Sequence, residues 1–124
     1  MYLCGGKLWK AFIYRLVSFS YHCDIPCKHE IIDGVYFNHR GFGIVINPNA
    51  NIGEGTGIQH SVTIGATARG CPTIGKNCHT GARAVIIGNI QIGDNVTIGA
   101  GTVVVKDIPD NAVVFGPASR IINQ

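Results

Sequence analysis

An aliphatic residue returns at nearly every sixth position between Ile44 and Val104, and this period constrains the fold more than any local propensity. An α-helix needs apolar residues at a period of about 3.6 and a simple hairpin strand needs a period of about 2, so a period of six excludes an ordinary helix bundle or sandwich. The sequence therefore predicts a parallel β-solenoid. Its interior positions in this stretch are Ile46, Ile52, Ile58, Ile64, Ile74, Thr80, Ile86, Ile92, Ile98 and Val104.

Two breaks in the repeat predict where the solenoid has expanded corners. Upstream, the period continues through Ile25, Ile31 and Phe37, but nine residues separate Phe37 from Ile46 and ten separate Ile64 from Ile74. Extra residues fit only at corners, so these two segments are expected to protrude as loops. Three six-residue steps per coil then predict three interior ladders. They are Ile25, Ile46, Ile64, Ile86 and Val104 on the first face, Ile31, Ile52, Ile74 and Ile92 on the second, and Phe37, Ile58, Thr80 and Ile98 on the third.

Glycine and charge content set further limits on the surface. A glycine follows Ile52, Ile64, Ile74, Thr80, Ile92 and Ile98, where it suits a tight bend that a side chain would obstruct. Only 14% of the residues are charged, which suggests a surface that associates with other copies of the chain. The net charge of +3 is unclustered, so nucleic acid is not an expected partner.

The five cysteines indicate a reducing compartment. Their number is odd and no secretory leader precedes them, so we expect a cytoplasmic protein with reduced thiols. Cys23 and Cys27 are four residues apart with no second pair at zinc-ribbon spacing, and no metal site is expected. No stretch approaches the roughly 20 apolar residues of a membrane span.

Residues 1–22 lie outside the repeat, and residues 23–124 form the solenoid domain with its C-terminal tail. Between Lys7 and Phe19, apolar residues recur at helical spacing and predict a short amphipathic helix. The favoured interpretation is a cap packed on the end of the solenoid. Attachment to a membrane surface is the alternative, although membrane contact is not expected. Past Val104 the repeat is expected to end over 106–111, and the segment 112–122 to cross and seal the final coil.

One corner collects residues that suit acid–base chemistry. Asp24 precedes Ile25 at the corner between the third and first faces, and His39, His60, Ala82 and Ala100 occupy the same corner in the following coils. A carboxylate beside an imidazole fixes its tautomer and stabilises the imidazolium that forms when the base takes a proton. His39 could instead only hydrogen-bond within its loop. His60 could be a metal ligand together with His39, but no third ligand is evident at this edge.

Seven short motifs between residues 24 and 122 carry a family resemblance. They are Gly43-Ile44-Val45-Ile46-Asn47, Val62-Thr63-Ile64-Gly65, Cys71-Pro72-Thr73-Ile74-Gly75, Ile86-Ile87-Gly88-Asn89-Ile90, Ile92-Gly93-Asp94-Asn95-Val96, Lys106-Asp107-Ile108-Pro109-Asp110-Asn111 and Gly116-Pro117-Ala118. These motifs resemble those of the hexapeptide-repeat acetyltransferases, specifically the serine acetyltransferase-like branch. The resemblance implies a left-handed parallel β-helix and a homotrimer that binds acetyl-CoA between subunits.

The resemblance also implies roles for individual residues. His39 matches the catalytic histidine of the family and Asp24 the aspartate of its dyad. In the implied mechanism His39 takes a proton from an acceptor hydroxyl that attacks the thioester directly, while main-chain N–H groups stabilise the oxyanion. The coenzyme contacts match Ala66, Ala82, Ala100 and Lys106.

Departures from the family pattern concern the acceptor. Serine acetyltransferases carry an Arg-His pair that helps to hold serine where this chain has Gly70 and Cys71, and an aspartate where it has Asn38. Their large N-terminal helical domain, which supplies part of the serine site, has no counterpart in the 22 residues before the solenoid. A zwitterionic acceptor would be poorly paired without these anchors. The acceptor is therefore serine or a sugar hydroxyl on a surface-polysaccharide precursor, with Asn38 and Cys71 as candidate contacts. A non-enzymatic scaffold and a zinc-dependent hydratase are the remaining alternatives.

Overall fold

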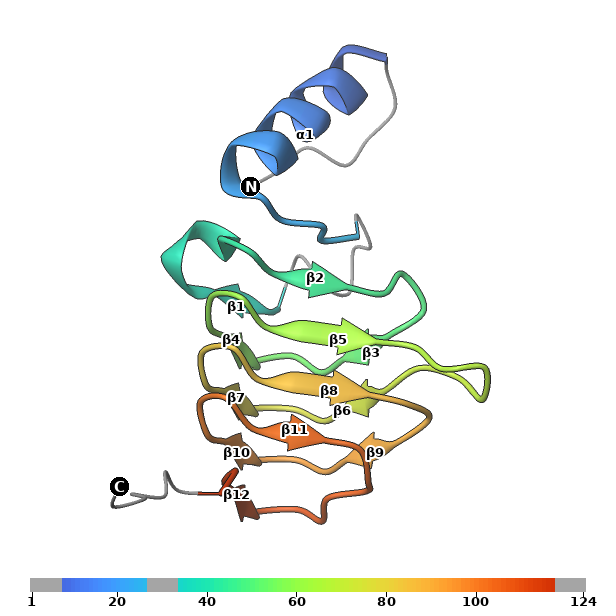
Figure 1. Ribbon diagram of the computed structural model, residues 1–124, viewed down its shortest axis with the longest axis vertical. Coiled ribbons are helices and arrows are strands. Elements are labelled where there is room, and N and C mark those ends of the chain that lie inside the picture. The colour runs from blue at the N-terminus through green and yellow to red at the C-terminus, as the bar shows by residue number, and fades with distance from the viewer. Residues whose placement is uncertain (1–7, 27–33, 118–124) are drawn as a thin grey trace, which may run out of the picture.

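The computed structural model describes residues 8–26 and 34–117, and these form a left-handed parallel β-helix preceded by one helix (Figure 1). Three parallel sheets make the faces of a triangular prism. The first face contains β2 (Val45–Ile46), β5 (Thr63–Gly65), β8 (Val85–Ile87) and β11 (Val103–Val104). The second contains β3 (Asn51–Ile52), β6 (Thr73–Ile74) and β9 (Gln91–Ile92). The third contains β1 (Tyr36–Phe37), β4 (Gly57–Ile58), β7 (His79–Thr80), β10 (Thr97–Ile98) and β12 (Val113–Val114).

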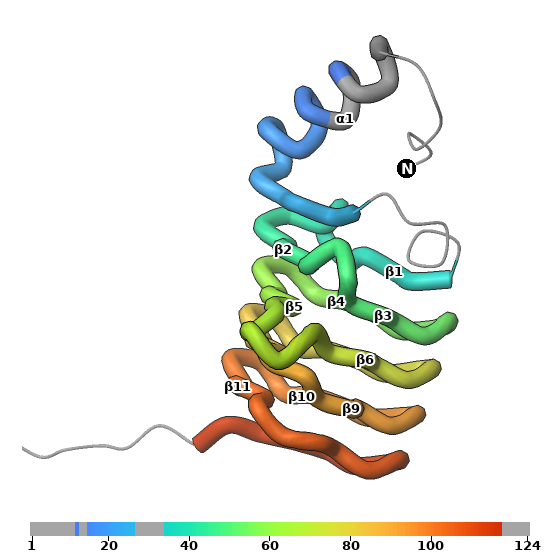
Figure 2. Tube along the Cα trace, turned by 90° about the vertical axis from the view of Figure 1, so that its right-hand side faces the viewer, coloured from blue at the N-terminus to red at the C-terminus, as the bar shows by residue number. Residues whose placement is uncertain are grey.

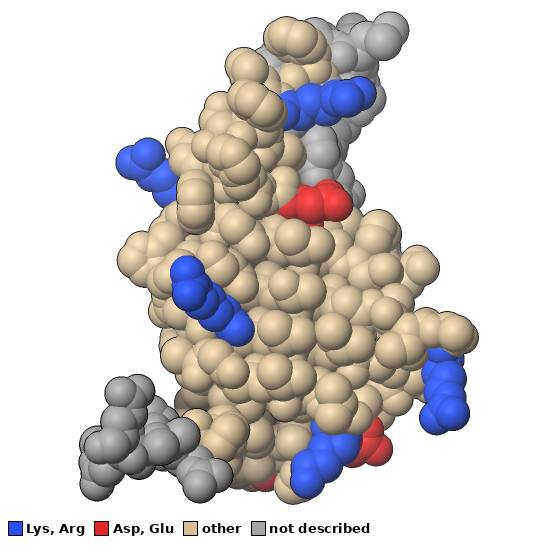
Figure 3. Space-filling view, viewed as in Figure 1, with Lys and Arg blue, Asp and Glu red and all other residues tan. Residues whose placement is uncertain are grey.

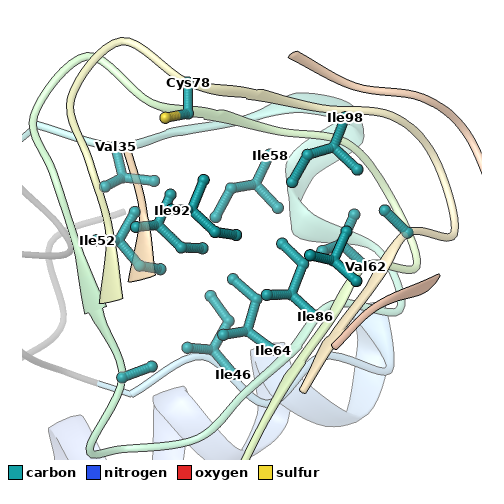
Figure 4. Packing of buried hydrophobic residues seen from close by; sticks show 14 of the residues in the cluster. Val35, Ile46, Ile52, Ile58, Val62, Ile64, Cys78, Ile86, Ile92 and Ile98 are labelled. Carbon is teal, nitrogen blue, oxygen red and sulfur yellow. The ribbon is translucent and has the colours of Figure 1, made fainter. Parts of the chain in front are cut away.

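The strand registers confirm the three ladders predicted from the repeat. Ile46 pairs with Ile64, which pairs with Ile86, and the same stacking continues to Val104. The ladders point into the prism and fill it, as the close-up shows (Figure 4). Phe37, which was predicted as an interior position, is only partly buried. The predicted interior position Ile31 lies outside the described residues. Thr80 is fully buried between Ile58 and Ile98.

The last coil corrects the expectation that the repeat ends over 106–111. Ile108 forms a parallel bridge with Ile92, so the second-face ladder continues after a step of only four residues from Val104. Six residues later, β12 pairs in parallel with β10, with Val114 beside Ile98. The chain therefore adds one more coil instead of crossing the end of the prism, at least as far as residue 117. The predicted remainder of the seal, 118–122, lies outside the described residues.

The glycines that follow interior positions are required for a different reason from the one expected. None of Gly53, Gly75 and Gly93, the glycines that follow the second-face ladder, has a positive φ, whereas the left-handed residues of that corner are Gly55, Asn77, Asn95 and Asn111. A Cβ on Gly75 would lie 2.5 Å from the carbonyl oxygen of Gly93 in the next coil. The missing side chain thus lets successive coils approach each other, and asparagine tolerates the left-handed bend.

Helix α1 (Leu8–Tyr21) projects from the N-terminal end of the prism (Figures 1 and 2). The helix was expected to pack on the prism as a cap, yet Phe12, Leu16 and Phe19 are exposed to 68%, 54% and 77%. Among the side chains that the structure describes in this segment, Tyr21 and Cys23 are the first to contact the core. Within the described residues, no helix has the length and hydropathy needed to cross a membrane.

Candidate active site

A column of main-chain hydrogen bonds defines the corner between the third and first faces. In successive coils one corner residue donates its N–H to a carbonyl oxygen of the preceding coil. The bonds run from Gly43 to Tyr21 (3.1 Å), Ser61 to Phe42 (2.8 Å), Arg83 to His60 (3.1 Å) and Gly101 to Ala82 (2.9 Å). The residues that turn this corner all have positive φ: His22, Gly43, Ser61, Arg83 and Gly101. The residues that precede them, and so stack in register, are Tyr21, Phe42, His60, Ala82 and Ala100.

His39 lies in this corner, as its place in the repeat predicts, but not in the regular stack. Phe42 occupies the stacked position, and His39 belongs to the extra residues that expand the coil. These residues form η1 (Asn38–Gly41), a tight turn whose central residues His39 and Arg40 do not have helical backbone angles. The sequence could not distinguish His39 from Phe42 because a repeat with inserted residues does not show which of them are the insertion.

The expanded corner is held in an unfavourable backbone conformation. His39, Arg40 and Gly41 have φ values of 50°, 57° and 73° in succession. A left-handed conformation costs a non-glycine residue about 1–2 kcal/mol, and such strain concentrates at functional sites. The turn is closed by two hydrogen bonds, because Phe42 N–H donates to the His39 carbonyl and Ile44 N–H to the Gly41 carbonyl, both at 3.2 Å. The strain thus sets the direction in which the exposed His39 side chain leaves the turn.

The imidazole rings of His39 and His60 contact each other across adjacent coils. Their centroids are 4.9 Å apart and their planes meet at 89°, which is an edge-to-face arrangement. His60 Nδ1 is buried and has no hydrogen-bond partner among the described residues. Sequence reasoning placed both histidines in one corner but left the role of His60 open, since only the structure shows that the rings touch.

Asp24 begins the first face one coil before β2. Its main-chain N–H donates to the Ile44 carbonyl and its carbonyl accepts from Ile46 N–H, each at 2.8 Å, so that Asp24 pairs with Val45. Its carboxylate is exposed. No hydrogen bond or ion pair joins Asp24 to His39 in the described part of the chain. The Asp24–His39 dyad therefore stays a prediction. Asp24 lies next to β2 on the first face, and His39 lies in the corner that leads into β2.

The corner offers main-chain donors below the histidines. The N–H groups of Ala82 and Ala100 make no main-chain hydrogen bond within the described residues, although the residues after them do. Both alanines lie at the surface of the corner, on successive coils. Unpaired N–H groups of this kind are strong hydrogen-bonding sites for a ligand.

The other predicted site residues lie at the opposite edge of the first face. Ala66 and Lys106 are exposed just after β5 and β11, at the corner that leads to the second face. Cys71 belongs to the loop that protrudes after β5 (Figure 1), and its thiol donates to Asn47 Oδ1 at 3.3 Å. Asn38, in contrast, is half-buried in η1 beside His39. A single chain thus divides the predicted coenzyme and acceptor contacts between two edges.

Neither a metal cluster nor a disulfide is found among residues 8–26 and 34–117. They contain no group of three or more His, Cys, Asp or Glu side chains that could hold a metal ion. Cys23, Cys71 and Cys78 are free thiols. Burial raises the pKa of Cys78, whose thiol donates to the Gly93 carbonyl at 3.1 Å, and burial likewise raises the pKa of Cys23.

Comparison with known proteins gives consistent matches. The bacterial transferase hexapeptide family (six repeats) matches residues 71–106. The chain is 45% identical over 125 residues to "Putative colanic acid biosynthesis acetyltransferase WcaB" of Escherichia coli K12, covering 94% of this chain and 75% of that protein. It is similar to the solved serine acetyltransferase (CysE) of Neisseria gonorrhoeae in complex with serine, with a TM-score of 0.64 and 39% identity. A serine acetyltransferase in complex with CoA gives a TM-score of 0.62 and 34% identity.

The two structural matches cover only part of the larger proteins. Each covers 71% of this chain and 37% of the solved chain. By sequence, the chain spans 38% to 45% of the length of three serine acetyltransferases that it matches. The similarity thus concerns the β-helix and the residues around it.

Proposed function

The chain belongs to the hexapeptide-repeat acetyltransferases, in their serine acetyltransferase-like branch, and from this premise we propose that it transfers an acetyl group from acetyl-CoA to an acceptor hydroxyl. The observation that carries the proposal is the strained corner that presents His39 to solvent with its ring held against His60. A general base must reach the proton it abstracts, and His39 is exposed at the surface of the corner.

His39 is the general base of the proposed reaction. A neutral imidazole has a ring nitrogen that can accept the proton of a hydroxyl. His60 restricts the orientation of the His39 ring by its edge-to-face contact, so less rotational freedom is lost when the acceptor binds. Asp24 is proposed to stabilise the imidazolium, in the role that the family resemblance assigns to it.

Four residues fit the requirements of a coenzyme site. The free N–H groups of Ala82 and Ala100 can donate to amide or thioester carbonyls, and the exposed ammonium of Lys106 suits a phosphate. Ala66 adds a main-chain group at the same edge as Lys106. Bound acetyl-CoA supplies the activated acetyl group, and the relative solved with CoA supports this choice.

A homotrimer would bring the two edges of the first face together between subunits. The coenzyme residues of one chain are divided between the two ends of the first-face strands, and so are the acceptor residues, so a groove between two copies can combine them. Exposed apolar side chains on and next to that face include Val45, Val103 and Val105. The middle of this face shows almost no charged side chains (Figure 3). An exposed apolar surface of this kind is typical of an interface.

A sugar hydroxyl is the acceptor class that the observations favour over serine. The match to WcaB covers 75% of that protein at 45% identity, whereas the match to Arabidopsis thaliana serine acetyltransferase 2 covers 38% at 36% identity. In addition, the Cys71 thiol is already bonded to Asn47, and neither residue can form an ion pair with a carboxylate. A site built for serine would need such partners.

The proposal is tested by measuring thiol release from acetyl-CoA with L-serine, nucleotide sugars and oligosaccharides as acceptors. We expect turnover with a sugar acceptor and a decrease in kcat of about 10²–10⁴-fold in His39→Ala, the usual contribution of a general base. An unchanged kcat in a folded His39→Ala protein would refute the assignment. If L-serine were the only acceptor turned over, the proposed acetyl transfer would stand but the proposed sugar acceptor would be wrong.

The role of His60 is separated from that of His39 by two substitutions. His60→Phe keeps an aromatic ring against His39, so we expect it to keep most of kcat and the wild-type pH profile. His60→Ala removes the ring, and we expect kcat to fall about tenfold with little change in KM. Equal losses in both variants would show that the imidazole nitrogens of His60 act chemically and that ring packing is not its role.

A further inference from the structure

Helix α1 presents an apolar face that the rest of the described chain leaves uncovered. Phe12, Leu16 and Phe19 are spaced by four and three residues, so they lie on one side of the helix. All three are more than half exposed, and the helix stands clear of the prism in both views (Figures 1 and 2). We call these three side chains the α1 apolar face.

This face continues toward the active corner through a row of rings. The Phe19 and His22 rings are stacked with centroids 6.1 Å apart, and His22 and Phe42 are 6.0 Å apart. Phe42 is exposed and stacks one coil above His60 in the corner column. Whatever covers the α1 apolar face is therefore close to the corner that carries His39.

The charge of the N-terminal segment points to the kind of partner. Residues 1–22 contain Lys7, Lys10 and Arg15 and no aspartate or glutamate. Arg15 is exposed on the helix next to the apolar face. Helices that pair with another helix commonly carry both signs of charge beside the apolar stripe, because the two chains then form salt bridges. A segment with only positive charges is instead complementary to an anionic surface.

We propose that α1 docks on an anionic lipid surface. The helix lies in the plane of the interface, with Phe12, Leu16 and Phe19 at the boundary of the acyl chains and the cations among the headgroups. Aromatic residues and leucine on one side with basic residues on the other are the pattern of interfacial helices. The helix has 14 residues, fewer than the roughly 20 needed to span a bilayer, so it lies on the surface and does not cross it. Binding of this kind requires two contributions that act together, the burial of apolar side chains and the attraction of basic side chains to anionic lipid.

The test is co-sedimentation of the full chain with vesicles. We compare vesicles of neutral phosphatidylcholine with vesicles that contain roughly 30 mol % phosphatidylglycerol, an anionic lipid. We expect binding to the anionic vesicles that falls about tenfold or more when the salt is raised from roughly 0.1 M to 0.5 M. Binding to neither vesicle, or equal binding to both, would overturn the proposal.

Matched variants separate lipid docking from other uses of the face. Phe12→Ser, Leu16→Ser and Phe19→Ser together should reduce binding about tenfold or more while the thermal transition of the prism is retained. Phe115→Ser is the control, because Phe115 is 74% exposed but lies after the last coil, and we expect it to bind like the wild type. Arg15→Glu should weaken binding to anionic vesicles with the apolar face intact. An oligomer that dissociates in the triple variant, without vesicle binding by the wild type, would show that a second copy of the chain covers the face, and lipid docking would be wrong.

Discussion

Two buried threonines should respond with opposite sign to the same substitution. Thr56 and Thr80 are both fully buried inside the prism. Thr56 lies at the corner between the second and third faces, and Thr80 belongs to the third-face ladder. The Thr56 hydroxyl donates to the Gly75 carbonyl at 2.9 Å and accepts from Cys78 N–H at 3.1 Å. The Thr80 hydroxyl donates only to the Gly57 carbonyl, at 3.4 Å. Valine has nearly the same shape as threonine, so each substitution isolates the contribution of the hydroxyl to the free energy of unfolding.

The hydrogen bonds determine the expected magnitudes. Thr56→Val leaves a buried N–H without its partner, which costs about 1–3 kcal/mol of the free energy of unfolding. The Thr80 bond is longer than the range of about 2.5–3.0 Å for O–H···O bonds, so it compensates little of the desolvation of its hydroxyl. Thr80→Val also adds an apolar group worth about 0.8 kcal/mol between Ile58 and Ile98. We therefore expect Thr80→Val to stabilise the chain by about 1 kcal/mol.

Thermal and urea unfolding followed by circular dichroism measure both effects. At this size about 1 kcal/mol corresponds to a change in Tm of roughly 5 °C. The variants must be compared at one protein concentration, since self-association would make Tm depend on it. A lower Tm for Thr80→Val, or an unchanged Tm for Thr56→Val, would refute the reasoning. Either result would mean that the hydrogen bonds of the two hydroxyls do not differ in their contribution to stability.

Two further predictions concern the packing between coils and the buried thiol. Gly81→Ala would place a Cβ 2.6 Å from the Gly99 carbonyl carbon, which the backbone cannot avoid, and we expect a loss of about 1–3 kcal/mol in denaturant unfolding. Gly65→Ala is its control at an equivalent position, because its Cβ would meet only the Ile87 side chain at 3.4 Å; a loss as large as that of Gly81→Ala would contradict this account. Burial raises the pKa of the Cys78 thiol above its ordinary value, so the contribution of this thiol to stability is complete below the ordinary thiol pKa and is lost as the pH rises through the higher folded-state pKa. A Cys78→Ala variant should therefore lose less stability than the wild type as the pH rises above about 8.5, the ordinary pKa of a cysteine thiol, and parallel stability curves for the two proteins would exclude this role.

The candidate site was only partly predictable from the sequence. Counting six-residue steps placed His39 and His60 in one corner, which the structure confirms. The count could not show that the two rings touch, since that contact depends on the strained turn at His39 and Arg40.

The repeat by itself determined that this protein is a parallel β-solenoid with three interior ladders, because a six-residue period is local, whereas its left-handed sense was expected only from the family resemblance. Each interior position fixes its neighbours along the chain, and identical steps can only stack, so the ladders and their registers follow without knowledge of distant contacts. Tertiary structure alone decided three things: that the glycines after interior positions are needed by the next coil, that the short step from Val104 to Ile108 still allows another coil, and that α1 leaves its apolar face exposed. Each of these depends on which atoms of separate coils or elements meet in space, and a periodic pattern contains no information about such meetings.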